Sequence, residues 1–296
     1  MPDTLVIPPT VDKAPKDRTA SYMAPTHSTT NPARRPDRFD REGHDQLIDV
    51  RDLQAALPGI ARLRSWAHEA LAVRPGESAV DIGSGTGSEV LAFADAVGPD
   101  GYAVGVEPDP NLLAAAERNA AEAGSAARFV TGDAYGLPFG AGSFDAALCE
   151  RVFQHLTAPT RATAEIARVL RPGGRVVVTD SDWGTAIVHP GDRKVVHEVI
   201  ETLIGNTTNP FAGRRLHGQL QQAGLIVDEV GSYALVQDAG IGAGALVARI
   251  SAMAVARGAI TEQQREQLLA DLRAGAESGD IHLSVTMFAV LAHKPG

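Results

Sequence analysis

The sequence predicts an α/β fold, an open and largely parallel sheet with helices on both faces. Short apolar segments alternate with helix-forming segments from about residue 79 to residue 180. The first apolar segment ends in glycines at alternate positions, and the segments that follow end in acidic residues. Alternating strands and helices indicate parallel strands, whose carboxyl ends meet at one edge of the sheet and form ligand sites there.

The central elements follow from the spacing of apolar residues. An amphipathic segment at residues 45–72 predicts one or two N-terminal helices, broken near Pro58-Gly59. The core that follows is predicted to contain strands at 79–83, 102–107, 127–132, 143–149 and 174–180. The predicted helices between them cover residues 87–97, 109–123 and 158–170.

After residue 180 the alternation is weaker. Residues 183–223 predict loop and helices, with the helical parts at 193–205 and 211–223. The rest predicts a strand at 225–236, two alanine-rich helices within 239–275 and a last apolar strand, Ser284–Ala292.

The chain divides into a tail and one folded domain. Residues 1–40 contain seven of the 18 prolines among polar residues, so they cannot bury enough apolar surface to order themselves. We expect a disordered tail, with the alternative that Tyr22 or Phe39 folds over a bound ligand as a lid. Residues 41–296 form the domain, and 44% hydrophobic content suffices for its core.

Composition restricts the classes of function. The net charge of −9 and the absence of a basic run argue against nucleic-acid binding. Cys149 is the single cysteine, so no internal disulfide forms, and we expect no metal site. No apolar run is long enough to span a membrane, and no signal peptide is evident at the N-terminus. We therefore expect a cytoplasmic protein.

The glycine loop predicts a nucleotide-type site. Gly83, Gly85 and Gly87 allow a sharp turn and close approach of the backbone to a ligand. The helix that follows directs its first amide groups into that loop. Glu107 ends the next strand, where one carboxylate can accept hydrogen bonds from two ribose hydroxyls. Asp133 ends the third strand, where its carboxylate and the Ala134 amide together can recognise adenine.

Five segments in register make the chain resemble the class I S-adenosylmethionine-dependent methyltransferases. They are Val80–Gly87, Gly105–Pro108, Gly132–Ala134 with Leu137–Phe139, Ser143–Asp145 and Arg168–Arg175. The resemblance implies a Rossmann-like seven-stranded sheet of order 3-2-1-4-5-7-6, with the last strand antiparallel. It also implies S-adenosyl-L-methionine as cofactor and a helical substrate cap within residues 183–280.

The resemblance assigns cofactor contacts position by position. The methionine end would be held by Glu150 and the first loop, which comprises Asp81, Gly83, Ser84, Gly85 and Gly87. Glu107, followed by Pro108, would bind the ribose, and Asp133 with Ala134 the adenine. Ser84 replaces a cysteine that many members carry. An NAD-dependent dehydrogenase is the rival, but the third glycine at position 87 breaks the G-x-G-x-x-G spacing.

Two residues past the strand ends are candidate catalytic groups. His155 is a general base or a residue that packs its loop, and Asp182 orients the acceptor or caps a turn. His189 is a weaker candidate. Cys149 is expected to be a buried strand-end thiol, and Arg214 lies on a solvated helix face or contacts the acceptor.

The acceptor is predicted from the variable segment. Residues 183–280 are moderately apolar without a basic cluster, which favours a small organic acceptor and, by analogy, natural-product tailoring. The alternative is an S-adenosylmethionine-binding enzyme that catalyses cyclisation or rearrangement. The sequence does not decide between a monomer and a homodimer. One arginine among Arg51, Arg62 and Arg64 could reach the cofactor carboxylate.

Overall fold

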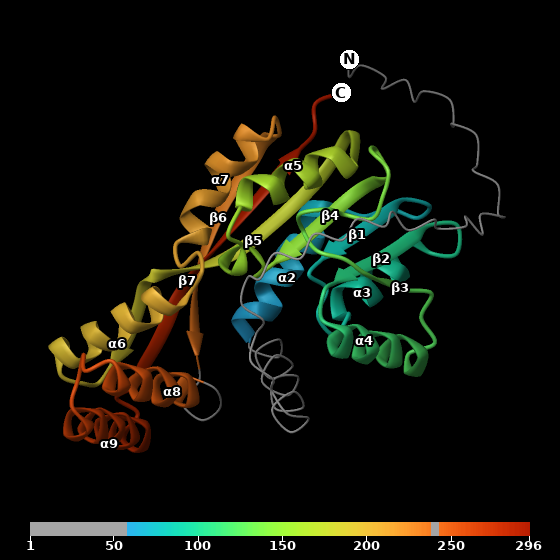
Figure 1. The fold of residues 1–296 in the computed structure, drawn as a ribbon. Coiled ribbons are helices and arrows are strands. Elements are labelled where there is room, and N and C mark those ends of the chain that lie inside the picture. The colour runs from blue at the N-terminus through green and yellow to red at the C-terminus, as the bar shows by residue number, and fades with distance from the viewer. Residues whose placement is uncertain (1–57, 238–242) are drawn as a thin grey trace, which may run out of the picture. The chain divides into compact units, whose positions relative to one another are not determined.

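The computed structural model describes residues 58–237 and 243–296 (Figure 1). The predicted tail at residues 1–40, its lid and the first part of the predicted helices at 45–72 lie outside these residues. The predicted break at Pro58-Gly59 coincides with the first described residue of helix α2, Pro58–Leu71.

A seven-stranded sheet of order β3-β2-β1-β4-β5-β7-β6 forms the core, which confirms the predicted strand order. Its strands are β1 Ser78–Ile82, β2 Tyr102–Glu107, β3 Arg128–Thr131, β4 Phe144–Glu150, β5 Leu170–His189, β6 Ile226–Gln237 and β7 His282–His293. β1 to β5 run parallel to one another, whereas β7 runs antiparallel to both of its neighbours, β5 and β6. The last strand is therefore reversed, as predicted.

Helices cover both faces of the sheet because alternate residues of the central strands are buried on opposite sides. On one face Ala146 and Leu148 of β4 pack with α2 and with α3, Ser88–Val97. On the other face Ala147 and Cys149 pack with α5, Pro159–Val169, and α7, Ala212–Gln222. Helix α4, Pro110–Glu122, contacts β2 and β3. Cys149 is fully buried, as expected, and burial raises the pKa of its thiol.

Two predictions after residue 180 need correction. The segment predicted as loop from residue 183 continues β5 as far as His189, because β7 pairs with it as far as His282. Helix α7, which the sequence places in the cap region, belongs to the sheet layer, since Ala212, Leu216 and Leu220 are buried in the main core. Strand pairing decides the first and core packing the second, both at long sequence separation, which local periodicity does not record.

Three of the described helices lie within the region predicted to contain the cap and outside the main core. They are α6 Arg193–Asn206, α8 Ala243–Ala256 and α9 Glu262–Ser278, and we call them the cap helices. They gather beside the far ends of β5 and β7 (Figure 1). Val199, Ile250, Leu268 and Leu283 belong to their own apolar cluster, separate from the main core.

Candidate functional site

The glycine loop after β1 has backbone conformations that favour glycine. Gly83, Gly85 and Gly87 have φ angles of 77°, 55° and 88°. A Cβ at Gly83 would lie 2.4 Å from Val152, and one at Gly87 would lie 2.7 Å from the Phe129 ring. At Gly85 a Cβ would meet no atom of the described residues within 4 Å, so among them the loop is open to a ligand there.

Glu107 closes the loop from the neighbouring strand. Its Oε2 accepts a hydrogen bond from the Gly85 amide at 2.9 Å, and its Oε1 accepts one from the Asp109 amide at 3.0 Å. The residue is 5% exposed, so two backbone amides fix its carboxylate at the sheet edge. An ionised carboxylate offers about four lone-pair sites, which leaves one on each oxygen for a ligand hydroxyl.

Asp133 lies at the same edge, two residues beyond β3. β2 and β3 pair in register up to Glu107 and Thr131, which brings both strand ends together. Asp133 Oδ1 accepts a hydrogen bond from the Tyr135 amide at 2.7 Å, whereas Ala134 is buried. The exposed Asp133 side chain thereby keeps a second oxygen for a donor.

An ionic cluster lies between α2, the start of α3 and the end of β4. Arg64 of α2 donates two hydrogen bonds to the Glu150 carboxylate, at 2.8 and 3.0 Å. Its Nη1 lies 3.0 Å from Glu89 Oε1, and His68 Nε2 lies 2.7 Å from the other oxygen of Glu89. One guanidinium therefore bridges two carboxylates that are each about nine-tenths buried.

Burial and neighbouring charges shift the pKa values in this cluster. Burial, with Glu89 and Glu150 nearby, raises the pKa of Asp81 well above its usual range. Burial opposes the charge of Arg64, but its bonds to Glu150 outweigh that effect and raise its pKa. Burial likewise opposes ionisation of Glu89, yet His68 and Arg64 lower its pKa overall. Glu89 and Glu150 around one arginine suit a ligand group that carries positive charge.

The comparisons place this site in a family. Residues 80–178 match the family model described as a methyltransferase domain. The chain is 34% identical over 184 residues to an uncharacterized 37.1 kDa protein in a Streptomyces fradiae transposon, covering 62% of this chain and 53% of that protein. It is 29% identical over 165 residues to a demethylmenaquinone methyltransferase of Symbiobacterium thermophilum, covering 54% and 65%.

A solved structure shows the same fold. The YcgJ protein of Bacillus subtilis superposes with a TM-score of 0.55 at 20% identity, over 78% of this chain and 97% of that one. The match over residues 80–178 and the shared fold support the class I S-adenosylmethionine-dependent methyltransferase family for this chain. The chain spans 53–65% of the length of three of the curated relatives it matches.

The residues of this site fit S-adenosylmethionine. Open space at Gly85 and the fixed carboxylate of Glu107 suit the backbone approach and the ribose hydroxyls. Ser84 Oγ is buried without a hydrogen-bond partner within the described residues, so the loop still has an unsatisfied polar atom. The Glu150 and Glu89 carboxylates suit the α-ammonium and sulfonium charges of the cofactor.

The two predicted catalytic residues have different surroundings. His155 is exposed in the 3₁₀ helix η1, Phe153–His155, directly past β4. Asp182 is fully buried, forms an ion pair with Arg214 of α7 and accepts the Gly184 amide at 3.1 Å. The structure therefore pairs Asp182 with Arg214, and the catalytic role predicted for each of the two residues stays a prediction.

Sequence reasoning missed a buried link between η1 and β5. Asp180 Oδ2 accepts the Gln154 amide at 3.0 Å, and Gln154 Oε1 accepts the Trp183 ring nitrogen, also at 3.0 Å. Burial raises the pKa of Asp180 to about 7, even though backbone amides partly offset it. Asp180 at a predicted strand end was the available signal, but its partners come from tertiary packing.

Arg64 and Glu89 were also not assigned as site residues. Arg64 was one of three candidate arginines; the structure brings it to Glu150, whereas Arg62 contacts Tyr233 and Arg51 lies outside the described residues. Glu89 could have been found as an acidic residue in the first turn after the glycine loop. His189, at the end of β5, is bonded to Asp280 at 3.2 Å.

Between residues 58 and 237 and from 243 onward, no group of His, Cys, Asp or Glu side chains is arranged to hold a metal ion. Within those same ranges, every helix is too short or too polar to cross a membrane.

Proposed function

We propose that this protein transfers the methyl group of S-adenosylmethionine to a small organic acceptor. The ionic cluster of Arg64, Glu89 and Glu150 beside the open glycine loop carries the proposal, because it offers charged partners for the cofactor's methionine end. The cofactor supplies a methyl group bound to a cationic sulfur. An acceptor nucleophile can attack that methyl carbon in line, with the sulfur as leaving group. The chain's part is to hold both reactants in line and to exclude water.

We place the acceptor beyond the carboxyl ends of the strands. There β5 continues past Thr179, the residue that pairs with Glu150 at the end of β4. For an acceptor whose nucleophile carries a proton, we assign His155 as general base, since it directly follows β4. Asp182 then serves as a positioning residue that fixes Arg214. A place in natural-product tailoring is part of the proposal, and the similarity to a demethylmenaquinone methyltransferase supports an organic rather than a macromolecular acceptor.

Titration calorimetry with S-adenosylmethionine and, separately, with NAD⁺ tests the cofactor. We expect binding of the former alone; binding of NAD⁺ alone would contradict the proposal. The Asp133→Ala variant should weaken S-adenosylmethionine binding by about 1.5–3 kcal/mol, because the adenine loses its acceptor. Asp100→Ala removes an exposed carboxylate after α3 and should leave the affinity unchanged.

Acceptor turnover separates methyl transfer from the alternative chemistry. A methyltransferase releases one S-adenosylhomocysteine for each product molecule, and the product gains one methyl group. A cyclase or rearrangement enzyme leaves the cofactor intact and the product mass unchanged. Mass spectrometry of cofactor and product from one reaction therefore distinguishes the two.

A further inference from the structure

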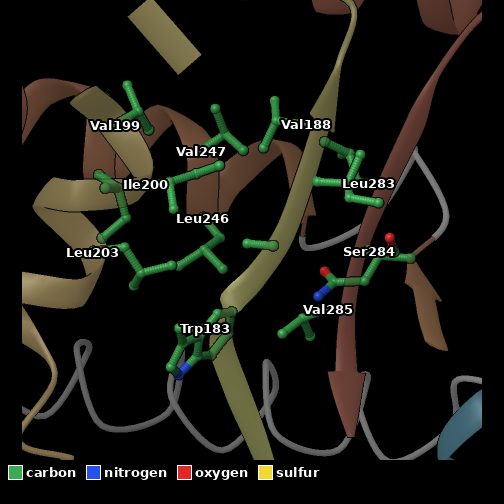
Figure 2. A pocket seen from close by; sticks show the side chains of 14 residues that line it. Trp183, Val188, Val199, Ile200, Leu203, Leu246, Val247, Leu283, Ser284 and Val285 are labelled. Atoms are coloured by element: carbon green, nitrogen blue, oxygen red, sulfur yellow. The ribbon is translucent and has the colours of Figure 1, made fainter. Parts of the chain in front are cut away.

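An apolar pocket lies beside the continuation of β5, outside the cofactor loop (Figure 2). β5, β7, α6 and α8 line it, with Gln237 at the end of β6, and its cavity volume is about 50 Å³. Among the described residues that line it, Gln237 and Ser284 are the polar ones besides the ring nitrogen of Trp183. Leu203 and Leu246 are large apolar side chains that pack against the apolar cluster of the cap helices but stay only partly buried.

Trp183 forms a fixed wall of this pocket. Its ring nitrogen donates to Gln154 at 3.0 Å, and its backbone amide donates to the Pro210 carbonyl at 2.9 Å. The indole therefore has its polar atom satisfied and offers an apolar surface. Since Gln154 belongs to η1, the pocket wall is joined directly to the segment that carries His155.

The strand register places the pocket relative to the cofactor site. Glu150 pairs with Thr179 of β5, and Trp183 follows four residues later along that strand. At about 3.3 Å per residue, the pocket begins ~13 Å along β5 from the methionine-end cluster. The apolar part of a ligand can thus stay in the pocket while its other end extends toward the methionine-end cluster.

We propose that this pocket binds the hydrocarbon portion of the acceptor, so that the substrate class is a lipophilic molecule with a polar, nucleophilic end. This inference rests on the proposed function. The polar end lies toward Glu150 and His155, while the apolar end lies among Ile200, Leu203 and Leu246 (Figure 2). Apolar walls of this kind bind by excluding water, with the few polar groups left to orient the ligand.

Straight-chain primary alcohols from hexanol to decanol are suitable probes, since each adds methylenes to one polar end. Calorimetry on the full chain should show affinity rising about fourfold for each methylene buried. The fluorescence of Trp183 reports binding at the pocket itself. Trp66→Phe leaves Trp183 as the single tryptophan, because the chain has two. Affinity independent of chain length, or no change in Trp183 emission, would overturn the inference.

Two matched variants localise the binding. Ile200→Phe narrows the pocket and should weaken decanol binding at least tenfold. Val230→Phe adds the same ring on the exposed side of β6, where Val230 is 52% exposed, and should leave decanol binding unchanged. Equal losses in both variants, or none in Ile200→Phe, would contradict the assignment; Leu246→Gln provides a second pocket variant should Ile200→Phe not fold.

Titration of S-adenosylmethionine into the same proteins distinguishes failure of the pocket assignment from failure of the proposed function. Cofactor binding without chain-length-dependent alcohol binding refutes the pocket assignment alone. Alcohol binding without cofactor binding refutes the proposed function, and with it the identification of the pocket's ligand as a methyl acceptor.

Discussion

The region around β1 to β4 and the region around β5 and β7 are built in different ways. Around β1 to β4 the site consists of strand ends: a glycine loop, Glu107, Asp133 and Glu150, each at or within a few residues of the last paired residue of its strand. Around β5 and β7 the strands continue past these strand ends and carry the cap helices. The first region is rich in fixed charge, whereas the second encloses an apolar pocket.

Under the proposed function, this difference follows from the ligand that each region recognises. A cofactor with ribose, adenine and charged groups requires directed hydrogen bonds, which short loops after rigid strands can hold in place. An apolar ligand requires excluded water and surface area, which side chains from several elements supply together. Variants in the two regions should therefore differ in which property they change.

The largest expected effect concerns the junction between the regions, at His155. If His155 is the general base, His155→Ala should lower kcat by about 10²–10⁴-fold while cofactor affinity stays within a factor of about two. Steady-state turnover of an identified acceptor, with calorimetry of the cofactor, measures both. Unchanged kcat would show that His155 has no catalytic role.

Within the cofactor region, Arg64→Met should reduce the free energy of unfolding by about 3–5 kcal/mol. The substitution leaves Glu89 and Glu150 largely buried without their cation. Urea denaturation measures the change. Arg265→Met is the matched control in the cap, because its partner Glu262 is half exposed and such pairs contribute less than about 1 kcal/mol. Similar losses in the two variants would contradict the structural importance of the Arg64 cluster.

Asp180 should make the free energy of unfolding depend on pH. Its folded pKa of about 7 exceeds the unfolded value near 3.8, so the folded state binds more protons between these values. Stability from this residue is therefore fully present below about pH 4 and falls as pH rises through 7, by at most about 4 kcal/mol.

Asp180→Asn should flatten that fall, while Asp95→Asn, an exposed position on α3, should leave it unchanged. Denaturant unfolding between pH 4 and pH 8 makes the comparison. A slope that is the same in both variants and in the original chain would show that Asp180 ionises without cost.

The sequence predicts the strand ends from β1 to β4 well for a physical reason. Their residues are local: the glycine loop, Glu107 and Asp133 each follow a strand whose apolar run is visible in the chain. The sheet order came from the resemblance, and the structure confirms it. By contrast, Arg64 joins Glu150 across 86 positions, and local periodicity could not choose it from three arginines.

The acceptor region was predicted less well because its order depends on long-range pairing. The β5 continuation holds its conformation by pairing with β7 across about 100 residues, so residues 183–189 read locally as loop. Arg214 is half exposed on α7, in line with a solvated helix face, but the sequence did not indicate its pairing with the fully buried Asp182. Neither contact leaves a pattern of short period in the sequence.

The smallest predicted effect tests whether the cap helices unfold independently of the cofactor region. Thr261 begins α9 with a capping box: its hydroxyl accepts the Gln264 amide, and the Gln264 side chain accepts the Thr261 amide. Thr261→Ala should cost about 1 kcal/mol, whereas Thr261→Ser keeps the hydroxyl and most of the stability.

Hydrogen exchange followed by mass spectrometry locates that loss. The cap helices have their own apolar cluster, so faster exchange in Thr261→Ala should be confined to α6, α8 and α9. Exchange in β1 to β4 should not change. Uniform acceleration of exchange across both regions would mean that the chain unfolds as one cooperative unit. The long strands β5 and β7 run through both regions, so they would then be the elements that couple the proposed acceptor pocket to the cofactor site.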